Sequence, residues 1–314
     1  MKPLVIGTRG SPLALAQTRW MVEQLQAAHA GLVIEVRPIQ TSGDRFADAS
    51  LVSQGGKGLF TKEIEEHLLA GEIDVAVHSL KDLPTTLPAG LTIGAVPDRE
   101  DARDALVSDR FDRIAALPTG ARVATSSLRR QAQLLAQRPD LHVEPIRGNV
   151  ETRLRKLSEE GWDATVLAMA GLRRLGVAAP AHPLAIEEMI PAVGQGLLAV
   201  EVREVDRRVR ELVAVLNAPA AAACGGAERA FLRVREENRA LLKSALGFEP
   251  SSEVNYTFPF FLIHHAPSGV LGLMLAVIFA AAMSTFSSEI NSLASATIVD
   301  FYRRYFRRTE GDQH

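Results

Sequence analysis

The sequence predicts an α/β fold built from two lobes with a ligand-binding cleft between them. Short apolar runs rich in Val and Ile alternate with helix-like stretches through residues 4–202, as in βαβ units. A charged, turn-rich segment at residues 97–108 indicates a crossover between the lobes, and a return crossover is expected near residues 191–196. At 314 residues the chain is long enough for two domains and a tail. Alternation of this kind favours mostly parallel, doubly wound sheets.

Strands are expected where an apolar, β-branched run ends in a turn or a helix start. The expected strands cover residues 4–7, 33–39, 73–79, 91–96, 122–126, 142–146, 164–168 and 197–202. We assign residues 1–97 and 194–217 to the first lobe and residues 98–193 to the second. Residues 218–233 are expected to begin a third domain, and residues 234–314 to form a hydrophobic helical tail.

Helix starts are marked by capping residues. Pro12 falls at a favourable first helical position, with Ser11 as its N-cap. Thr61 is expected to cap a helix over residues 62–70, which Gly71 would end. In open α/β folds, helices that follow strands begin at the carboxyl edge of the sheet, where ligands bind.

The composition limits the kinds of partner that the chain can take. A formal net charge of −2 argues against a general nucleic-acid binder, so any basic site must be local. A single cysteine excludes an internal disulfide framework and a cysteine-based metal cage, and it fits a reducing compartment. The first residues hold too short an apolar run for a signal peptide. We therefore expect residues 1–233 to be cytoplasmic and to bind neither nucleic acid nor metal.

Four short motifs concentrate charge at predicted strand ends: GTRGSPLA at residues 7–14, HSLKDLP at 78–84, TSSLRR at 125–130 and RGNVETRL at 147–154. Three of them place arginine where a strand gives way to a helix, whose free N–H groups also attract anions. The remaining motif places the Asp82 carboxylate beside Lys81. Together they indicate a ligand with several carboxylates or phosphates and a step of proton transfer.

Arginine suits an anion clamp because its planar fork holds carboxylate oxygens in pairs and stays protonated. The candidate clamp consists of Arg9, Arg129, Arg130, Arg147 and Arg153. The neutral donors at the same strand ends are Ser11, Thr125, Ser126, Ser127 and Asn149. The alternative is that arginines at helix starts are solvated surface charges, but three such turns in one α/β unit favour the clamp.

Asp82 is the candidate for catalysis, because a carboxylate beside a cationic intermediate stabilises it and passes protons to or from nitrogen. Lys81 would keep Asp82 ionised if the two side chains approach. The alternative, which the pattern leaves equally open, is that Asp82 caps the turn before Pro84. Asp44 allows the same two interpretations, with the turn favoured. His78, at the end of its strand, is expected to be structural.

Residues 1–233 contain, in this order, the motifs GTRGSPLALAQ, TSGD, GGKGLFTKEIE, HSLKDLP, REDARDAL, VATSSLRRQAQ, RGNVETRLRKL, PAVGQGLLAVE and AERAFLR. This set resembles the porphobilinogen deaminase (hydroxymethylbilane synthase) family. The resemblance implies a transferase of tetrapyrrole (haem) biosynthesis that joins four porphobilinogen units head to tail and releases ammonia. It also implies a monomer, two lobes like those of periplasmic binding proteins, and a third domain that carries a dipyrromethane cofactor on cysteine.

The resemblance assigns roles to individual residues. Asp82 matches the family's catalytic aspartate, which assists loss of the amino group and stabilises the azafulvene cation. The matching cofactor- and substrate-binding residues are Arg9, Ser11, Asp44, Phe60, Lys81, Ser127, Arg129, Arg130, Arg147, Asn149, Arg153 and Gln195. The basic residues of this set would hold acetate and propionate groups, Asp44 would face the cofactor, and Phe60 would belong to a mobile loop.

The sequence departs from the family after AERAFLR. The family continues into a Gly-Gly-Cys segment whose sulfur holds the cofactor, whereas here VREENRALLKSALGFEP follows and no cysteine comes after it. Cys224 lies before Glu228, on the wrong side of the motif, and is not assigned the anchoring role. We therefore expect little or no deaminase activity and no covalent cofactor in this chain.

Residues 234–314 differ in character from the rest of the chain. No Asp, Glu, Lys or Arg occurs in residues 254–288, and residues 258–286 form an interrupted apolar stretch long enough to span a bilayer. A buried core helix is the alternative. Arginines follow the stretch and would place the C-terminus on the cytoplasmic side; they are Arg303, Arg304, Arg307 and Arg308.

This tail resembles one transmembrane region of the sodium:solute symporter family. Ala281, Ser284 and Thr285 match positions of a sodium site in that family, but a lone helix cannot rebuild the site. The chain is therefore interpreted as a mosaic of a deaminase region and a symporter fragment. Because a large uncovered apolar patch promotes association, we expect the full chain to aggregate or attach to membranes.

Two other classes of function remain open. One is a non-catalytic binder of an acidic small molecule, which would use the same arginines but would not need Asp82. The other is a component of a membrane transporter, which the single apolar segment makes the weaker alternative.

Overall fold

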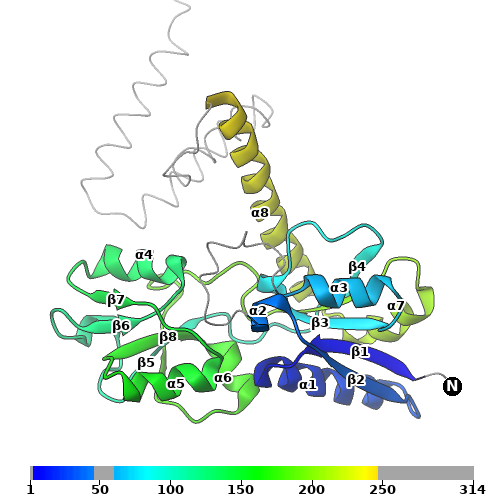
Figure 1. The fold of residues 1–314 in the computed structure, drawn as a ribbon, viewed down its shortest axis with the longest axis horizontal. Coiled ribbons are helices and arrows are strands. Elements are labelled where there is room, and N and C mark those ends of the chain that lie inside the picture. Colours follow the sequence, from blue (N-terminus) through cyan, green and yellow to red (C-terminus); the bar gives the residue numbers. More distant parts are fainter. Residues whose placement is uncertain (1–2, 46–59, 247–314) are drawn as a thin grey trace, which may run out of the picture. The chain divides into compact units, whose positions relative to one another are not determined.

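The computed structural model describes residues 3–45 and 60–246 (Figure 1). The chain divides into two compact units, Met1–Arg233 and Val234–His314. The described part of the first unit is an α/β fold with two five-stranded sheets. Of the predicted tail, residues 234–314, the structure describes 234–246, which are helical, while residues 247–314 with the apolar stretch lie outside the described residues.

The first sheet has the strand order β2-β1-β3-β10-β4, and the second has the order β7-β6-β8-β5-β9. The strands of the first sheet are β1 (Leu4–Arg9), β2 (Ile34–Ile39), β3 (Val75–Ser79), β4 (Leu91–Ala95) and β10 (Leu198–Arg203). Those of the second are β5 (Asp104–Val107), β6 (Arg122–Ala124), β7 (His142–Glu144), β8 (Ala164–Ala168) and β9 (Ala181–Pro183). Every predicted strand is present with small shifts at its ends, whereas β5 and β9 were not predicted.

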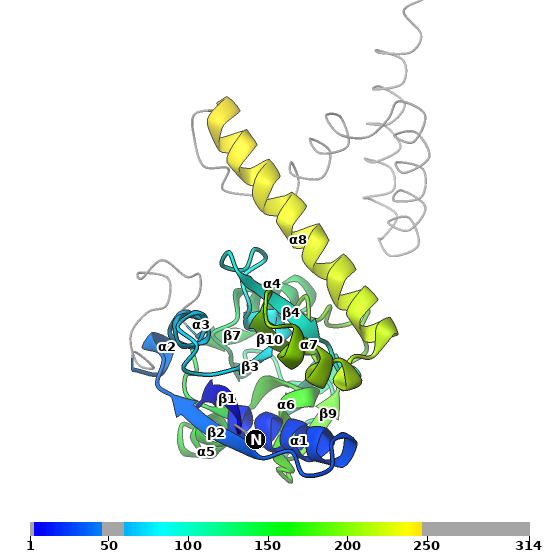
Figure 2. The ribbon, with the colours of Figure 1, turned by 90° about the vertical axis from the view of Figure 1, so that its right-hand side faces the viewer.

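Helices follow most strands and cover the sheets (Figures 1 and 2). The α-helices are α1 (Pro12–Ala28), α2 (Ser42–Arg45), α3 (Lys62–Leu69), α4 (Leu128–Gln137), α5 (Val150–Glu159), α6 (Met169–Leu175), α7 (Arg207–Val213) and α8 (Pro219–Leu246). The 3₁₀-helices are η2 (Leu80–Asp82), η3 (Ile114–Ala116) and η4 (Ala214–Leu216). Within the described ranges, no helix is both long enough and apolar enough to cross a membrane.

Each sheet contains one strand that runs against its neighbours. β1 pairs in parallel with β2 and β3, and β6 pairs in parallel with β7 and β8. β10 is antiparallel to β3 and β4, and β5 is antiparallel to β8 and β9. The prediction of mostly parallel sheets is therefore corrected to mixed sheets. The inverted strands, β5 and β10, are the first that the chain forms after it crosses from one sheet to the other.

The charged segment at residues 97–108, expected to be only a crossover, also contains β5. All four residues of β5 are buried, and Asp104 at its start is 0% exposed. Sequence analysis missed β5 because a buried strand is recognised by an apolar run, and the apolar run of β5 is short and preceded by charged residues.

The two crossovers lie against each other. Glu100 N donates to Gly196 O at 3.1 Å, and Arg99 Nε donates to Gln195 O at 2.9 Å. Gly196 has φ +87°, and a Cβ built on it would lie 2.3 Å from Glu100 O. Only glycine fits there, so the return turn fixes one crossover against the other.

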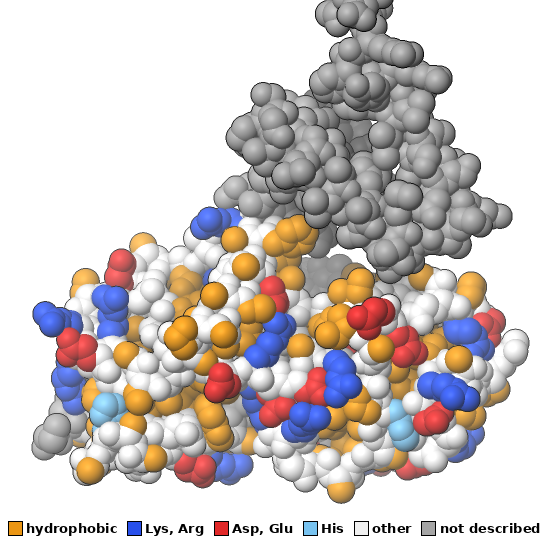
Figure 3. Space-filling view, turned by 180° about the vertical axis from the view of Figure 1, so that it is seen from behind, with side chains coloured by type: hydrophobic (Ala, Val, Ile, Leu, Met, Phe, Trp, Pro, Cys, Tyr) orange, Lys and Arg blue, Asp and Glu red, His pale blue; other side chains and the backbone are white. Residues whose placement is uncertain are grey.

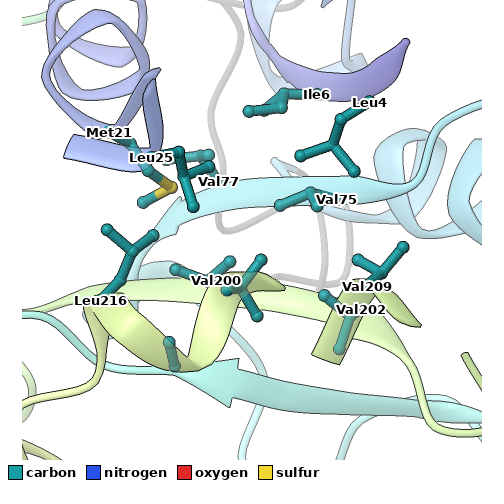
Figure 4. Packing of buried hydrophobic residues seen from close by; sticks show 12 residues of the cluster. Leu4, Ile6, Met21, Leu25, Val75, Val77, Val200, Val202, Val209 and Leu216 are labelled. Atoms are coloured by element: carbon teal, nitrogen blue, oxygen red, sulfur yellow. The ribbon is translucent and has the colours of Figure 1, made fainter. Parts of the chain in front are cut away.

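Both faces of each sheet are buried, as the doubly wound prediction requires. On one face of the first sheet, Leu4 and Val200 pack against Met21 of α1 and Val209 of α7 (Figures 2 and 4). A separate cluster that includes Ile64 of α3 covers part of its other face. Two further clusters cover the faces of the second sheet.

The two predicted helix starts are present, but only one uses its cap as expected. Ser11 accepts a hydrogen bond from Ala14 N at 3.3 Å, and Pro12 begins α1. Thr61 precedes α3, but its side chain forms no capping hydrogen bond. Gly71 follows the end of α3 with φ +74°, which suits glycine.

The surface of the first unit mixes charges of both signs on the face seen in Figure 3. Lys and Arg side chains on that face are interspersed with Asp and Glu side chains. This pattern agrees with the small net charge and offers no broad basic field on that face.

A buried titratable cluster lies on the α3 side of the first sheet. His78 Nε2 is 3.2 Å from Glu201 Oε2, and both residues are nearly or fully buried. Burial raises the pKa of Glu65 on α3, and the Glu201 charge raises it further. His78 thus lies in the protein interior, in keeping with its expected structural role.

Replacing Glu65 by glutamine is expected to stabilise the fold more at pH 8 than at pH 4. Because the folded-state pKa is raised, wild-type stability falls as the pH rises through that pKa, and the neutral amide avoids this loss. Thermal unfolding of both proteins across this pH range measures the difference. An equal shift in Tm at every pH would contradict the explanation.

Candidate functional site

The Lys81–Asp82 pair lies in η2, directly after the carboxyl end of β3. Leu80 is buried, and its N–H donates to Leu197 O at 2.9 Å, which fixes the start of the turn. Lys81 and Asp82 are both solvent-exposed. Among residues 3–45 and 60–246, neither side chain forms a hydrogen bond or ion pair, so both are available to a ligand.

Lys81 is exposed as a residue, but protein around its side chain partly desolvates the charge. Burial lowers the pKa of Lys81, and Asp82 opposes this shift. The charges of Arg130 and Arg129 also lower this pKa, so the second lobe brings its cations within electrostatic range of the first. Such an environment favours an anionic ligand, which would relieve the repulsion between these cations.

Asp104 organises the cations of the second lobe. Arg129 Nη2 and Arg130 Nη2 donate to its two carboxylate oxygens at 2.6 and 2.7 Å. Gln195 Nε2 donates to the same carboxylate at 3.0 Å. Burial alone raises the pKa of Asp104, but the Arg130 and Arg129 guanidiniums outweigh it and hold the pKa below its usual value.

Two residues expected to contact ligand lie beneath the site. Arg130 is 7% exposed, and besides Asp104 it donates from Nη1 to Val166 O at 2.9 Å. Gln195 is 1% exposed and also donates to Ala102 O at 2.7 Å. Both side chains thus hydrogen-bond within the protein, and their contact with ligand stays a prediction. Arg129, with a side chain that is 26% exposed, remains open to the site.

Arg153 is the strongest sign of an anion site. Its Nε donates to Gly148 O at 2.8 Å, and no acidic side chain pairs with it in the described part of the chain. Burial lowers the pKa of Arg153, and the charge of Arg130 lowers it further. A half-buried cation without a counter-ion is costly unless a ligand supplies the negative charge.

The neutral residues of the motifs shape the helix starts. Ser11, Ser127 and Asn149 are the N-caps of α1, α4 and α5, and each side-chain oxygen accepts a backbone N–H from the first turn. Thr125 Oγ1 accepts from Ser127 N at 3.2 Å, and Ser126 Oγ donates to Ile146 O at 2.7 Å. These residues therefore build the turns on which the arginines stand.

Helix starts from the two lobes meet at Gly171 of α6. A Cβ built on Gly171 would lie 3.7 Å from Leu13 of α1 and 3.9 Å from Val150 of α5. The free N–H groups at the starts of α1 and α5 therefore lie on adjacent parts of the two lobes, and both favour negative charge.

The remaining predicted residues are placed as follows. The Arg9 guanidinium lies over the Phe60 ring, 4.2 Å from its centroid. Arg147 is half-buried at the turn before α5. The side chain of Asp44 lies outside the described residues, as do Ala281, Ser284 and Thr285.

Asp104 is the residue of the candidate site that sequence reasoning missed. It lies in the motif REDARDAL, but its charge was interpreted as part of a crossover. The available signal was an acid directly before the apolar run Ala105–Val107, which β5 contains. No group of three or more His, Cys, Asp or Glu side chains that could hold a metal occurs within the described ranges.

This arrangement can bind a ligand with several carboxylates and can exchange a proton at Asp82. Lys81, Arg129 and Arg153 supply positive charge from two lobes, and Asp82 is the acid on the same turn as Lys81. A groove of about 510 Å³ lies between β4 and α8; Leu80 lines it, but none of these four residues does. The candidate site is therefore defined by the contacts and charges of these four residues and not by this groove.

Comparison with known families gives two matches on separate segments. The model of the porphobilinogen deaminase, dipyromethane cofactor binding domain, matches residues 4–211. The model of the sodium:solute symporter family matches residues 245–314.

Comparison with solved structures gives matches of low identity and low TM-score, periplasmic binding proteins among them. A periplasmic substrate-binding protein of an ABC transporter from Coxiella burnetii is 16% identical with a TM-score of 0.41, over 72% of this chain and 96% of that one. The periplasmic aliphatic sulphonate binding protein from Escherichia coli is 16% identical with a TM-score of 0.39, over 82% of this chain and 83% of that one.

Curated relatives agree with the first family match. The porphobilinogen deaminase of Syntrophotalea carbinolica is 54% identical over 231 residues, covering 73% of each chain. That of Geobacillus kaustophilus is 52% identical over 238 residues, covering 75% of this chain and 77% of the relative. By the family match over residues 4–211 and these identities, the chain belongs to the porphobilinogen deaminase family.

Proposed function

We propose that the candidate site binds porphobilinogen and serves the hydroxymethylbilane synthase reaction of haem biosynthesis, in which four porphobilinogen units are joined with release of ammonia. The proposal rests on two cations and one acid. Within the described ranges, neither Lys81 nor Arg153 has an acid bonded to it, and Asp82, next to Lys81 in the chain, is exposed. Porphobilinogen bears carboxylates and an amine, so it needs both kinds of group.

The cations bind and orient the substrate's acetate and propionate groups. Arg153 and Arg129 offer guanidinium N–H groups that can form paired hydrogen bonds with a carboxylate. Lys81 supplies a point charge on the first lobe. Arg9 and Arg147 extend this set at the ends of β1 and of the turn before α5. Arg130 and Gln195 act from below through Asp104.

The role of Ser11, Ser127 and Asn149 is to hold helix starts whose N–H groups face anions. Family membership also supports Asp44 and Phe60 as neighbours of the bound pyrroles. Phe60 contributes an aromatic face already occupied by Arg9.

Asp82 holds or moves a proton at the substrate's amino nitrogen. Ammonia leaves as a neutral molecule when the amine is protonated, and the ring system left behind is cationic. A carboxylate beside this cation stabilises it, and general acid–base catalysis of this kind typically contributes about 10²–10⁴-fold in rate. Replacing Asp82 by alanine tests this role: porphobilinogen affinity should change little, whereas the residual ammonia release, already small in this chain, should fall further. A loss of affinity equal to the loss of ammonia release would argue for a purely structural turn.

The described residues fit only part of the family's dipyrromethane cofactor. Lys81, Arg129 and Arg153 suit its carboxylates, and when bound it would supply the pyrrole chain that is extended. The covalent attachment is not matched. Cys224, on α8, is the chain's one cysteine, and its thiol lies 3.3 Å from Glu228 on the same helix and 3.4 Å from Arg99 before β5.

We therefore expect the purified full-length chain to carry no covalent dipyrromethane and to release little ammonia from porphobilinogen. Intact-mass spectrometry checks the first point, with the mass calculated from the sequence as the expected result. An added mass equal to two pyrrole units on any residue would overturn the expectation.

We infer further that the chain joins a two-lobed deaminase region, with residues 1–97 and 194–217 in one lobe and 98–193 in the other, to a symporter-like segment. The separate family matches support this division. We expect the full chain to remain with membranes or aggregates through residues 258–286, and the deaminase region to be monomeric. Fractionation after an alkaline wash tests this: a wholly soluble, monomeric chain would contradict it.

A further inference from the structure

The first half of α8 packs against the turn that carries Lys81 and Asp82. A Cβ built on Gly225 would lie 2.8 Å from Leu80 Cδ2 and 3.1 Å from Leu197 Cδ1. A larger side chain would have to displace these leucines, so the helix backbone itself forms the wall behind the turn. Leu80 begins η2, directly before Lys81.

Arg229, one helical turn further along α8, binds the segment that follows Asp82. Its Nη2 donates to Pro84 O at 2.6 Å and to Thr85 O at 3.0 Å, and its Nη1 donates to Leu83 O at 3.5 Å. The planar fork of arginine can reach several acceptors at once. One side chain thus restrains three consecutive backbone carbonyls.

Arg229 uses its donors on backbone carbonyls only. In the described ranges it forms no ion pair, and Glu201 acts on it only at longer range. A groove of about 510 Å³ lies beside the same segment and is lined by Thr85, Ile93 and Arg229, among others. Leu83 is buried in an apolar cluster with Leu80 and Leu197, whereas Thr85 lines the groove, so Arg229 adds most to the restraint at the Thr85 end of the segment.

α8 also contacts the return crossover, which lies against the same turn. Glu228 Oε2 accepts from Gly194 N at 2.6 Å. Gly194 has φ +71°, and a Cβ built on it would lie 3.1 Å from Lys81 N. Residues 225–229 therefore hold the turn on both sides of Lys81 and Asp82.

We propose that Arg229 is a positioning residue for Asp82: by binding the carbonyls of residues 83–85, it fixes the exit of the turn and so keeps the carboxylate beside the cations of the site. This inference rests on the proposed function for its consequence, but its structural part can be measured without any ligand. Arg229 itself is assigned no contact with substrate.

The test compares hydrogen exchange in the full-length wild type and in Arg229→Met, with Arg207→Met as the control. Arg207 is also an arginine of the first lobe, but its side chain is 89% exposed and pairs only with Glu211. Loss of the Arg229 hydrogen bonds should speed exchange about tenfold in peptides covering residues 79–86, equivalent to about 1.4 kcal/mol of local stability. Exchange elsewhere in the first sheet, and all exchange in Arg207→Met, should stay unchanged.

Unchanged exchange in residues 79–86 would overturn the proposal, and so would equally faster exchange throughout the first sheet. If Arg229→Met does not fold, Arg229→Lys replaces it; one ammonium cannot span the three carbonyls, so faster exchange confined to the same peptides is again expected. A porphobilinogen titration of the same proteins gives the functional arm, with weaker binding expected for the Arg229 variant only. If the wild type does not bind porphobilinogen, the proposed function is wrong. The hydrogen-exchange result still decides whether Arg229 restrains residues 79–86.

Discussion

Replacing Asp104 by asparagine is expected to lower the free energy of unfolding by about 3–5 kcal/mol, the typical cost of removing one partner from a buried ion pair. Asp104 is fully buried, and its carboxylate accepts from Arg129 and Arg130 at 2.6 and 2.7 Å. Asparagine has a similar shape but no charge, so both guanidiniums lose their counter-ion. Urea unfolding at neutral pH measures the loss.

The pH dependence gives this prediction a second test. The pKa of Asp104 is held below its usual value, so its contribution is present above the usual aspartate range and is lost as the pH falls through the folded-state pKa. The gap between wild type and Asp104→Asn should therefore narrow in acid. Asp112→Asn is the matched control, because the Asp112 side chain is 66% exposed, lies 3.9 Å from Arg113 and should matter little. A gap that is small, or that does not change with pH, would contradict the role given to Asp104.

Replacing Arg153 by methionine is expected to weaken porphobilinogen binding by about 10–100-fold, the value of one or two charge-assisted hydrogen bonds. The same change should leave the free energy of unfolding equal or raise it. Arg153 has no acidic partner in the described part of the chain, and both burial and Arg130 disfavour its charge. Methionine keeps an apolar stem of similar length without that cost.

Arg155→Met is the control on the same helix. Arg155 is exposed and pairs with Glu159 at 2.8 Å, so its replacement should leave affinity and stability nearly unchanged. Calorimetric titration and urea unfolding of both variants separate the two effects. An Arg153→Met protein that is destabilised but still binds normally would assign Arg153 to the fold and remove it from the site.

The sequence could predict those parts of the fold whose residues have a local preference for a strand or for a helix start. Val- and Ile-rich runs located β1, β3 and β8, and the Ser11–Pro12 pair located the start of α1. The direction of β5 and β10 could not be predicted, because it depends on which sheet the chain joins after each crossover. Such pairing is a long-range property, and local patterns do not record it.

The sequence could predict which charged residues belong to the candidate site, but not how the environments of these residues differ. Sequence treated Arg129, Arg130 and Arg153 alike, since each is an arginine near a helix start. Their environments differ: Arg130 is buried against Asp104, whereas Arg153 is half-buried without an acid in the described ranges. The difference arises because Asp104 pairs with Arg130 and not with Arg153. Sequence analysis did not place Asp104 in a strand, because charged residues precede it.

The central claim is that these cations bind the carboxylates of the substrate. Calorimetric titration of the full-length chain with porphobilinogen and with its dimethyl ester tests it most directly, because esterification removes both negative charges and keeps the pyrrole and the amine. We expect the acid to bind at least about 100-fold more tightly than the ester, and the difference to shrink at high salt. Equal affinity for both compounds, or no binding of either, would contradict the account.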